Sequence, residues 1–205
     1  MFLRLILQKV GDFRKGGISV DTGASSYRRY LDGDENGFIE LVRDYKDGLM
    51  LYLNRIVCDI HIAEDLTEDT FVKLGTKKPK YKQEKGSFKK WLYTIGRNVA
   101  IDYLRKNSKI SEISIENCGQ FSAEQENLEN LIIKEERKII VRNALNKLKP
   151  EYRQVIWLTY FENFNNKEVA DVMKKSVHNI ETLLYRARKA LKAELEKEGF
   201  EYENL

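Results

Sequence analysis

Proline is almost absent from this chain, and its scarcity limits the folds that the chain can form. Only 2 of the 205 residues are prolines, Pro79 and Pro150. Because proline interrupts helices, long stretches remain in which helices can continue unbroken. Apolar residues recur there at spacings of three and four, and the Asn-Gly pair at Asn36 leads into such a helical pattern rather than a hairpin. We therefore predict an all-α fold.

Three helices are expected in the first half of the sequence. The segment FIELVRDYKDGLMLYLNRIV, which begins at Phe38, has a wide apolar face. A second helix should begin near Ala63, with its leucines and phenylalanine inward and its acids outward. After a lysine-rich loop around Pro79, a third should follow Ser87, which is a suitable N-cap.

Charge is distributed in blocks along the sequence. Residues 73–109 hold 12 basic and 2 acidic side chains, and residues 137–192 hold 13 basic and 5 acidic ones. Between these blocks, residues 110–136 hold 7 acidic side chains and 1 basic one. Two basic blocks with an acidic spacer indicate two surfaces for a polyanion. For either block alone, lysine-rich helices that are simply solvated remain an alternative.

We interpret the chain as two small helical domains joined by a flexible acidic linker. The first domain spans residues 26–107, the linker 108–136 and the second domain 137–198. An N-terminal arm, residues 1–25, has weak periodicity and several glycines, so we expect it to be disordered. The last residues, 199–205, form an acidic tail.

The second domain contains a helix-turn-helix pattern in the segment NNKEVADVMKKSVHNIETLLYRARKALK. Asn165 or Asn166 is expected to cap its first helix, the turn is Lys174-Lys175, and Ser176 can cap the second helix. Three apolar residues should point inward from the second helix: Val177, Ile180 and Leu184. In this motif, early residues of the second helix meet base edges in the major groove. An ordinary αα-hairpin is the alternative interpretation.

The residues of the second helix that point outward are candidates for contacting duplex DNA. They are Ser176, His178, Asn179, Thr182, Arg186 and Arg188.

The segment GSFKKWLYTIGRNVAIDYLRK, residues 86–106, combines aromatic rings with cations. Rings stack on unpaired bases, which is worth about 1–3 kcal/mol per base, while cations neutralise phosphates. The candidate contacts in and before this segment are Lys82, Lys89, Lys90, Trp91, Tyr93, Arg97, Asn98 and Arg105. Phe88 and Tyr103 are interpreted as core residues, whereas both a core and a stacking role remain open for Trp91 and Tyr93.

No cofactor, metal site or catalytic activity is expected. Cys58 and Cys118 lie far apart without CxxC partners, so we expect neither a structural disulfide nor a zinc site, and a reducing cytoplasmic location is the default. No apolar run approaches the roughly 20 residues that span a bilayer. A metal-dependent nuclease using Glu64, Asp65, Glu68 and Asp69 is disfavoured, because adjacent acids at a helix start are ordinary dipole partners and no histidine cluster accompanies them.

Four segments, in this order, resemble the extracytoplasmic-function (ECF) sigma factors of bacterial RNA polymerase, a group of the sigma-70 family. They are AEDLTEDTFVKL, SFKKWLYTIGRNVAIDYLRK, LKPEYRQVIWLTYFENFNNKEVADVM and SVHNIETLLYRARKAL. The run from Trp91 to Arg105 is the most specific part of the resemblance, which extends from about Tyr27 to Leu195.

The resemblance implies a promoter-specificity subunit that is not itself an enzyme. Its partners would be core RNA polymerase, promoter DNA and an anti-sigma factor, with no insertion into a membrane. The basic loop and the helix from Trp91 would bind the melted minus-10 element, and the helix from Ser176 would read the duplex minus-35 element. The residues that would bind core polymerase are Asp65, Leu66, Glu68 and Phe71. A stand-alone helix-turn-helix regulator is the alternative, and a homodimer would favour it.

Two departures from the family pattern concern the helix-turn-helix. Lys174 stands where a glycine is usual in the turn, and Glu181 and Leu183 stand where basic residues are common. Glu181 would repel phosphate, although its carboxylate could accept a hydrogen bond from a cytosine amine.

Overall fold

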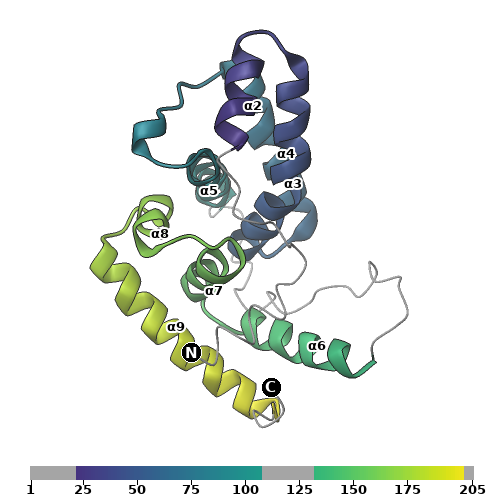
Figure 1. Ribbon diagram of the computed structural model, residues 1–205. Coiled ribbons are helices and arrows are strands. Elements are labelled where there is room, and N and C mark those ends of the chain that lie inside the picture. Colours follow the sequence, from purple (N-terminus) through teal and green to yellow (C-terminus); the bar gives the residue numbers. More distant parts are fainter. Residues whose placement is uncertain (1–21, 108–131, 201–205) are drawn as a thin grey trace.

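The computed structural model describes residues 22–107 and 132–200, with side chains from residue 139 onward in the second range. Every regular element in these two ranges is helical and none is a strand, so the prediction of an all-α fold is confirmed (Figure 1). The first range contains α2 (Thr22–Leu31), α3 (Glu35–Val57), α4 (Ile60–Lys77), a 3-10 turn η1 (Gln83–Lys85) and α5 (Phe88–Asn107). The second contains α6 (Ile132–Asn146), α7 (Pro150–Ile156), a π-helical turn η3 (Trp157–Phe161), α8 (Asn166–Met173) and α9 (Val177–Lys197).

Helix α3 is the centre of the first half and packs against α2, α4 and α5 (Figure 1). Asp34 caps it by accepting a hydrogen bond from the Asn36 backbone, so the Asn-Gly pair begins a helix as predicted. Its apolar face is buried at Leu41, Leu49, Tyr52, Leu53 and Ile56. Helix α4 begins at Ile60, three residues before the expected start at Ala63, because the Asp59 carboxylate caps it.

Helix α2 begins within the segment that we expected to be a disordered arm. It starts at Thr22, and Gly23 and Ala24 are buried. A Cβ atom at Gly23 would lie 2.5 Å from Phe88 Cδ1 and 2.5 Å from Tyr45 Oη, so only glycine fits at this contact. Residues 22–25 therefore belong to the first helical unit, and a glycine that suggested disorder serves close packing instead.

Helix α9 is the longest element of the second half, and α6, α7 and α8 pack against it. Ile180 and Leu184 of α9 are buried against this core, as predicted. Val177 was also expected to point inward, and that prediction is wrong, because its side chain is 41% exposed. As the first residue of α9, it lies next to the turn, at the end of the helix-helix contact.

The two halves contact each other, α3 with α7 and α5 with α8 (Figure 1). Arg55 donates a hydrogen bond to the Asn146 side chain at 3.2 Å, and Arg153 donates one to Cys58 Sγ at 2.9 Å. The expectation of no disulfide is wrong, because Cys58 is disulfide-bonded. Sequence separation gave no sign of this bond. The only other cysteine, Cys118, lies outside the described residues.

Candidate nucleic-acid interface

The basic loop is fixed against the start of α5 by a cluster of aromatic rings. Trp91 is half-buried, with its ring centroid 5.2 Å from Tyr81, 5.4 Å from Tyr27 and 5.5 Å from Phe88. The Tyr81 hydroxyl donates to the Gly86 carbonyl at 2.8 Å, and the Tyr27 hydroxyl donates to the Pro79 carbonyl at 2.7 Å. Burial raises the pKa of Tyr27 to about 12, so this hydroxyl remains a donor at neutral pH.

Helix α5 itself starts as the sequence predicts. Ser87 Oγ accepts a hydrogen bond from the Lys90 backbone at 3.3 Å, the bond expected of an N-cap residue. Phe88, Leu92 and Val99 are buried, and the expected core role of Phe88 is confirmed. Tyr103 is half-buried and packs against the same core.

The predicted single-strand contacts divide into three groups by exposure. Lys82 and Arg105 are exposed. Four more are half-buried: Lys89, Trp91, Arg97 and Asn98. Lys90 is 9% exposed and Tyr93 is fully buried. The Tyr93 ring stacks on Tyr52, with centroids 5.4 Å apart, so no base can reach its face in this conformation.

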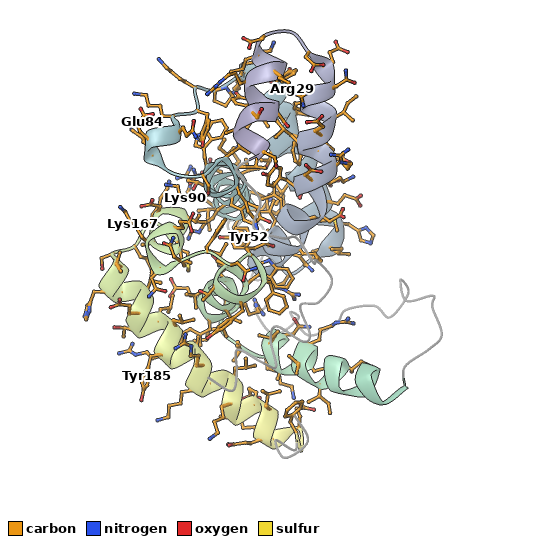
Figure 2. All side chains as sticks on the ribbon, in the orientation of Figure 1. Arg29, Tyr52, Glu84, Lys90, Lys167 and Tyr185 are labelled. Atoms are coloured by element: carbon orange, nitrogen blue, oxygen red, sulfur yellow. The ribbon has the colours of Figure 1, made fainter. Side chains whose placement is uncertain are left out.

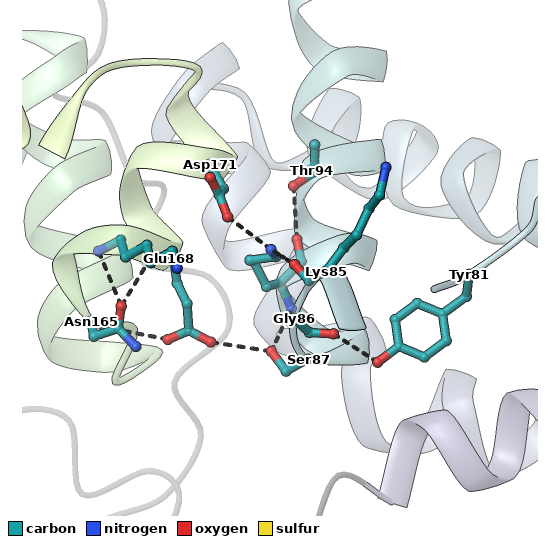
Figure 3. A network of polar contacts seen from close by, with 10 residues as sticks. Tyr81, Lys85, Gly86, Ser87, Thr94, Asn165, Glu168 and Asp171 are labelled. Atoms are coloured by element: carbon teal, nitrogen blue, oxygen red, sulfur yellow. Dashed lines mark hydrogen bonds and ion pairs between the residues drawn. The ribbon is translucent and has the colours of Figure 1, made fainter. Parts of the chain in front are cut away.

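Both lysines at the start of α5 bond to the second half of the protein. Lys89 Nζ lies 2.8 Å from a carboxylate oxygen of Glu162. Lys90 Nζ lies 2.8 Å from a carboxylate oxygen of Asp171, a contact that reaches α8 (Figure 3). Sequence analysis missed both acids as partners. Since each acid is 73 or 81 residues from its lysine, only the fold brings them together.

Helix α4 carries the residues expected to bind polymerase. Asp65 and Glu68 are exposed, whereas Leu66 and Phe71 are buried in the core. Lys46 of α3 lies 3.7 Å from Glu68, a loose pair in which the carboxylate stays accessible. The acids are therefore the ones that a partner could contact, and the two apolar residues hold the helix in place.

The helix-turn-helix is capped at both helix starts. The Asn165 side chain accepts from the Lys167 and Glu168 backbones, while the Glu168 side chain accepts from the Asn165 backbone. These reciprocal bonds form a capping box. Ser176 Oγ accepts from the Asn179 backbone at 3.2 Å and so caps α9 as predicted. Between the helices, Lys174 adopts the left-handed conformation with φ 54°, the conformation in which glycine is usual.

The outer face of α9 presents the predicted duplex-reading residues to solvent. Ser176, His178, Asn179, Arg186 and Arg188 are exposed, and Thr182 is half-buried. Asn179, Thr182 and Arg186 also line a shallow hollow with Lys175 and Leu183. Tyr185, which is 69% exposed, points away from the core on the same helix (Figure 2).

Arg188 is held differently from the other exposed cations of α9. Its Nε donates to the Tyr160 hydroxyl at 2.6 Å, and its guanidinium lies 5.6 Å from the centroid of that ring. Arg188 therefore has a fixed direction, whereas Arg186 stands at the edge of the hollow.

The described ranges 22–107 and 132–200 meet neither the requirements of a metal site nor those of a membrane-spanning helix. These residues contain no group of three or more His, Cys, Asp or Glu side chains that could hold a metal ion. None of the helices there is long and apolar enough to cross a membrane.

Two family models match the chain. The model described as Sigma-70 region 2 matches residues 41–110, which include α5. The model described as Sigma-70, region 4 matches residues 138–191, which include the helix-turn-helix. The matched residues thus contain all of α5 and the part of α9 up to Leu191, and with them the candidate DNA contacts.

Several curated proteins are similar over most of their length. The ECF RNA polymerase sigma factor SigM of Bacillus subtilis is 32% identical over 156 residues, which cover 75% of this chain and 92% of SigM. The ECF RNA polymerase sigma factor SigW of the same organism is 26% identical over 171 residues, covering 80% of this chain and 91% of SigW.

Two solved structures share the fold. The sigma factor RpoE from Bartonella quintana, in complex with the anti-sigma factor NepR, has a TM-score of 0.61 at 22% identity, covering 78% of this chain and 96% of RpoE. CnrH, in complex with the cytosolic domain of CnrY, has a TM-score of 0.58 at 23% identity, covering 85% and 95%. These two structures show the fold, and the two matched regions together with the relative SigM identify this chain as a member of the ECF sigma factors in the sigma-70 family.

Proposed function

We propose that this sigma factor directs promoter-specific initiation through three contacts: with core RNA polymerase, with the melted minus-10 element and with the duplex minus-35 element. In this proposal residues 22–107 form a domain for polymerase and the opened strand, and residues 137–198 form a domain for the duplex. The segment 108–136 joins them. The observation that carries the proposal is that sigma-70 regions 2 and 4 match the two helical units that bear the two basic surfaces.

For the opened strand, we assign the basic loop and α5. Lys82 and Arg105 are exposed and can neutralise phosphates. Trp91 is half-buried in the ring cluster and keeps part of its surface for stacking on an unpaired base. Lys89 and Lys90 join this surface only when Glu162 and Asp171 move away.

For the duplex, we assign the first half of α9. Asparagine pairs with adenine and arginine with guanine through two hydrogen bonds each in the major groove. Asn179 and Arg186 supply these two side chains at the edge of the hollow. His178 and Thr182 flank them, and Arg188, oriented by Tyr160, is assigned to the phosphate backbone.

For core polymerase, we assign the exposed acids of α4, Asp65 and Glu68, with Leu66 and Phe71 supporting that helix from inside. The structural relatives RpoE and CnrH were solved with an anti-sigma factor and with the cytosolic domain of CnrY. We propose that an anti-sigma factor also binds the present chain. We also propose that the protein has no catalytic activity of its own and works in the cytoplasm, where polymerase meets the promoter.

Run-off transcription from a promoter library, with bacterial core polymerase and with or without this protein, tests the proposal. We expect transcripts that require the protein and that decline in Lys82→Ala/Arg105→Ala. The matched control, Arg43→Ala/Lys197→Ala, removes two exposed cations outside both assigned surfaces. If no transcripts form while the free protein binds duplex DNA tightly and in a salt-sensitive manner, the stand-alone regulator replaces the sigma mechanism for this chain.

A further inference from the structure

The hollow on the outer face of α9 contains one apolar side chain among polar ones. Its lining residues are Lys175, Asn179, Thr182, Leu183 and Arg186. Four of them lie on α9 at relative positions i, i+3, i+4 and i+7, the spacing at which residues share one face of a helix. Asn179 and Arg186 already have assigned bases, whereas the leucine between them has none.

Leu183 is anchored on one side and accessible on the other. Its neighbour Leu184 is 4% exposed and fills the core position at this turn of α9. Leu183 itself is half-buried and packs at the margin of the core. The first turn of α9 is fixed by its cap, in which Ser176 Oγ accepts a hydrogen bond from the Asn179 backbone. Part of the Leu183 side chain therefore faces the hollow in a defined position.

The charge around the hollow favours a polyanion as its partner. Lys175 and Arg186 contribute two cations to the lining. Lys175 Nζ lies 2.9 Å from a carboxylate oxygen of Glu151, and Arg186 is exposed. Cations attract duplex DNA irrespective of its sequence, and an α-helix fits the major groove. An apolar side chain beside these cations then meets a base edge in that groove.

Leucine discriminates between bases in the major groove because it has no polar side-chain atoms. Adenine, guanine and cytosine present amino groups or the N7 and O6 acceptors there, and thymine adds a C5-methyl group. A leucine that packs against an amino group or an acceptor removes water from it without replacing the hydrogen bond, which is unfavourable. Against the methyl group of thymine, the same leucine buries apolar surface on both sides of the contact.

We propose that Leu183 selects a thymine in the duplex minus-35 element by packing against its C5-methyl group. This inference rests on the proposed assignment of that element to α9. Leu183 lies four residues after Asn179, which is about 6 Å along the helix axis. Because base pairs are about 3.4 Å apart, the thymine is expected one or two base pairs from the adenine that Asn179 contacts.

The first measurement is selection from a library of random duplex sequences at low salt. The full-length chain, Leu183→Ala and a matched control, Leu31→Ala, each bind the library, and the bound duplexes are sequenced after repeated rounds. Leu31 is 43% exposed and belongs to α2, so the control removes the same atoms outside α9. We expect a thymine near an adenine to be enriched by the wild type and by the control. Leu183→Ala should keep the adenine and lose the preference for thymine.

The second measurement removes the methyl group itself, because deoxyuridine lacks only the C5-methyl group of thymidine. In anisotropy measurements on the selected, fluorescein-labelled duplex, deoxyuridine replaces the selected thymine. The wild type and Leu31→Ala should then bind about fourfold more weakly, since the burial of one methyl group is lost. Leu183→Ala should bind both duplexes equally. If Leu183 had only a structural role, its substitution would weaken binding to both duplexes alike and leave the fourfold difference intact.

Three results overturn the proposal. The first is a selected sequence without thymine at such a position, including no enrichment of any sequence. The second is equal affinity of the wild type for the thymine and deoxyuridine duplexes, a comparison that stays decisive if Leu183→Ala does not fold. The third is an undiminished deoxyuridine effect in a folded Leu183→Ala, because another group then contacts the methyl.

These readouts contain no polymerase, so the two proposals fail separately. Absence of transcripts in the run-off assay would reject the promoter function and leave the deoxyuridine result unaffected. Transcripts that depend on the protein, together with equal affinity for the two duplexes, would leave the function standing and reject the selection of thymine by Leu183.

Discussion

The guanidinium carbon of Arg55 lies 4.6 Å from the centroid of the Trp157 ring, and this contact joins α3 to η3 across the two halves of the protein. Arg55 is only 9% exposed. Burial, and then the nearby cations Arg153 and Arg142, lower the pKa of Arg55 to about 10. The planar ring face compensates part of the cost of burying this charge, because cation-π attraction strengthens when water is excluded.

Replacing Arg55 with lysine should therefore destabilise the protein although the charge is formally kept. Lysine loses the planar stack on Trp157 and the hydrogen bond to Asn146, so we expect the free energy of unfolding to fall by about 1–2 kcal/mol. Urea denaturation followed by tryptophan fluorescence measures the change. Arg43→Lys, at a side chain that is 69% exposed, is the control. Equal stabilities of the two variants would mean that the stacked guanidinium contributes nothing.

A second prediction concerns the close approach of α2 to α3. A Cβ atom at Gly37 would lie 2.3 Å from the Ser26 backbone oxygen and 2.9 Å from the Tyr30 backbone nitrogen. Backbone atoms cannot move aside as a side-chain tip can, so Gly37→Ala should lower the free energy of unfolding by about 1–3 kcal/mol.

Gly75→Ala is the matched control for this substitution, since Gly75 is also helical and the nearest atom to its Cβ would be Phe38 Cζ at 3.4 Å. Alanine is the better helix former, so this control should gain up to about 1 kcal/mol. Thermal unfolding of both variants separates the steric cost from helix propensity. A stabilised Gly37→Ala would show that α2 does not pack this closely in solution.

Much of the fold follows from local patterns in the sequence. The buried face of α3, the outward acids of α4, the cap at Ser87 and the cap at Ser176 are all confirmed. Helical periodicity and N-capping depend on residues within a turn or two of each other. A single sequence contains that information in full.

What the sequence did not predict depends on partners that are distant along the chain. Tyr93 is fully buried because Tyr52 and Phe164 enclose it, and Phe164 belongs to the other half. The disulfide at Cys58 and the start of α2 at Thr22 likewise depend on residues that are distant along the sequence. Residues 137–192 hold 13 basic and 5 acidic side chains, and the sequence did not predict that three of these acids, Glu162, Glu168 and Asp171, gather where α5 packs.

A third prediction concerns Glu181 on the outer face of α9. It is exposed among the assigned duplex contacts, and its charge opposes approach to phosphates. Glu181→Gln should bind a labelled duplex of mixed sequence about two- to threefold more tightly in anisotropy measurements at low salt. Glu196→Gln makes the same change in charge on the same helix, far from those contacts, and should have a smaller effect. Weaker binding by Glu181→Gln would indicate that this carboxylate accepts hydrogen bonds from bases even in mixed sequence.

The last prediction concerns the turn between α8 and α9, where Lys174 has φ 54°. A side chain with a Cβ atom is strained in this left-handed conformation, whereas glycine adopts it readily. Lys174→Gly should therefore raise the free energy of unfolding by about 1 kcal/mol, measured by urea denaturation.

Lys174→Ala distinguishes backbone strain from charge, because alanine removes the ammonium group but keeps the Cβ atom. We expect this variant to be no more stable than the wild type. If alanine stabilises as much as glycine does, the cause is the crowding of cations around the turn, where Lys175 already pairs with Glu151 at 2.9 Å. If neither variant differs from the wild type, the turn relaxes enough to absorb the strain, and the departure from glycine at this position has no cost for the helix-turn-helix.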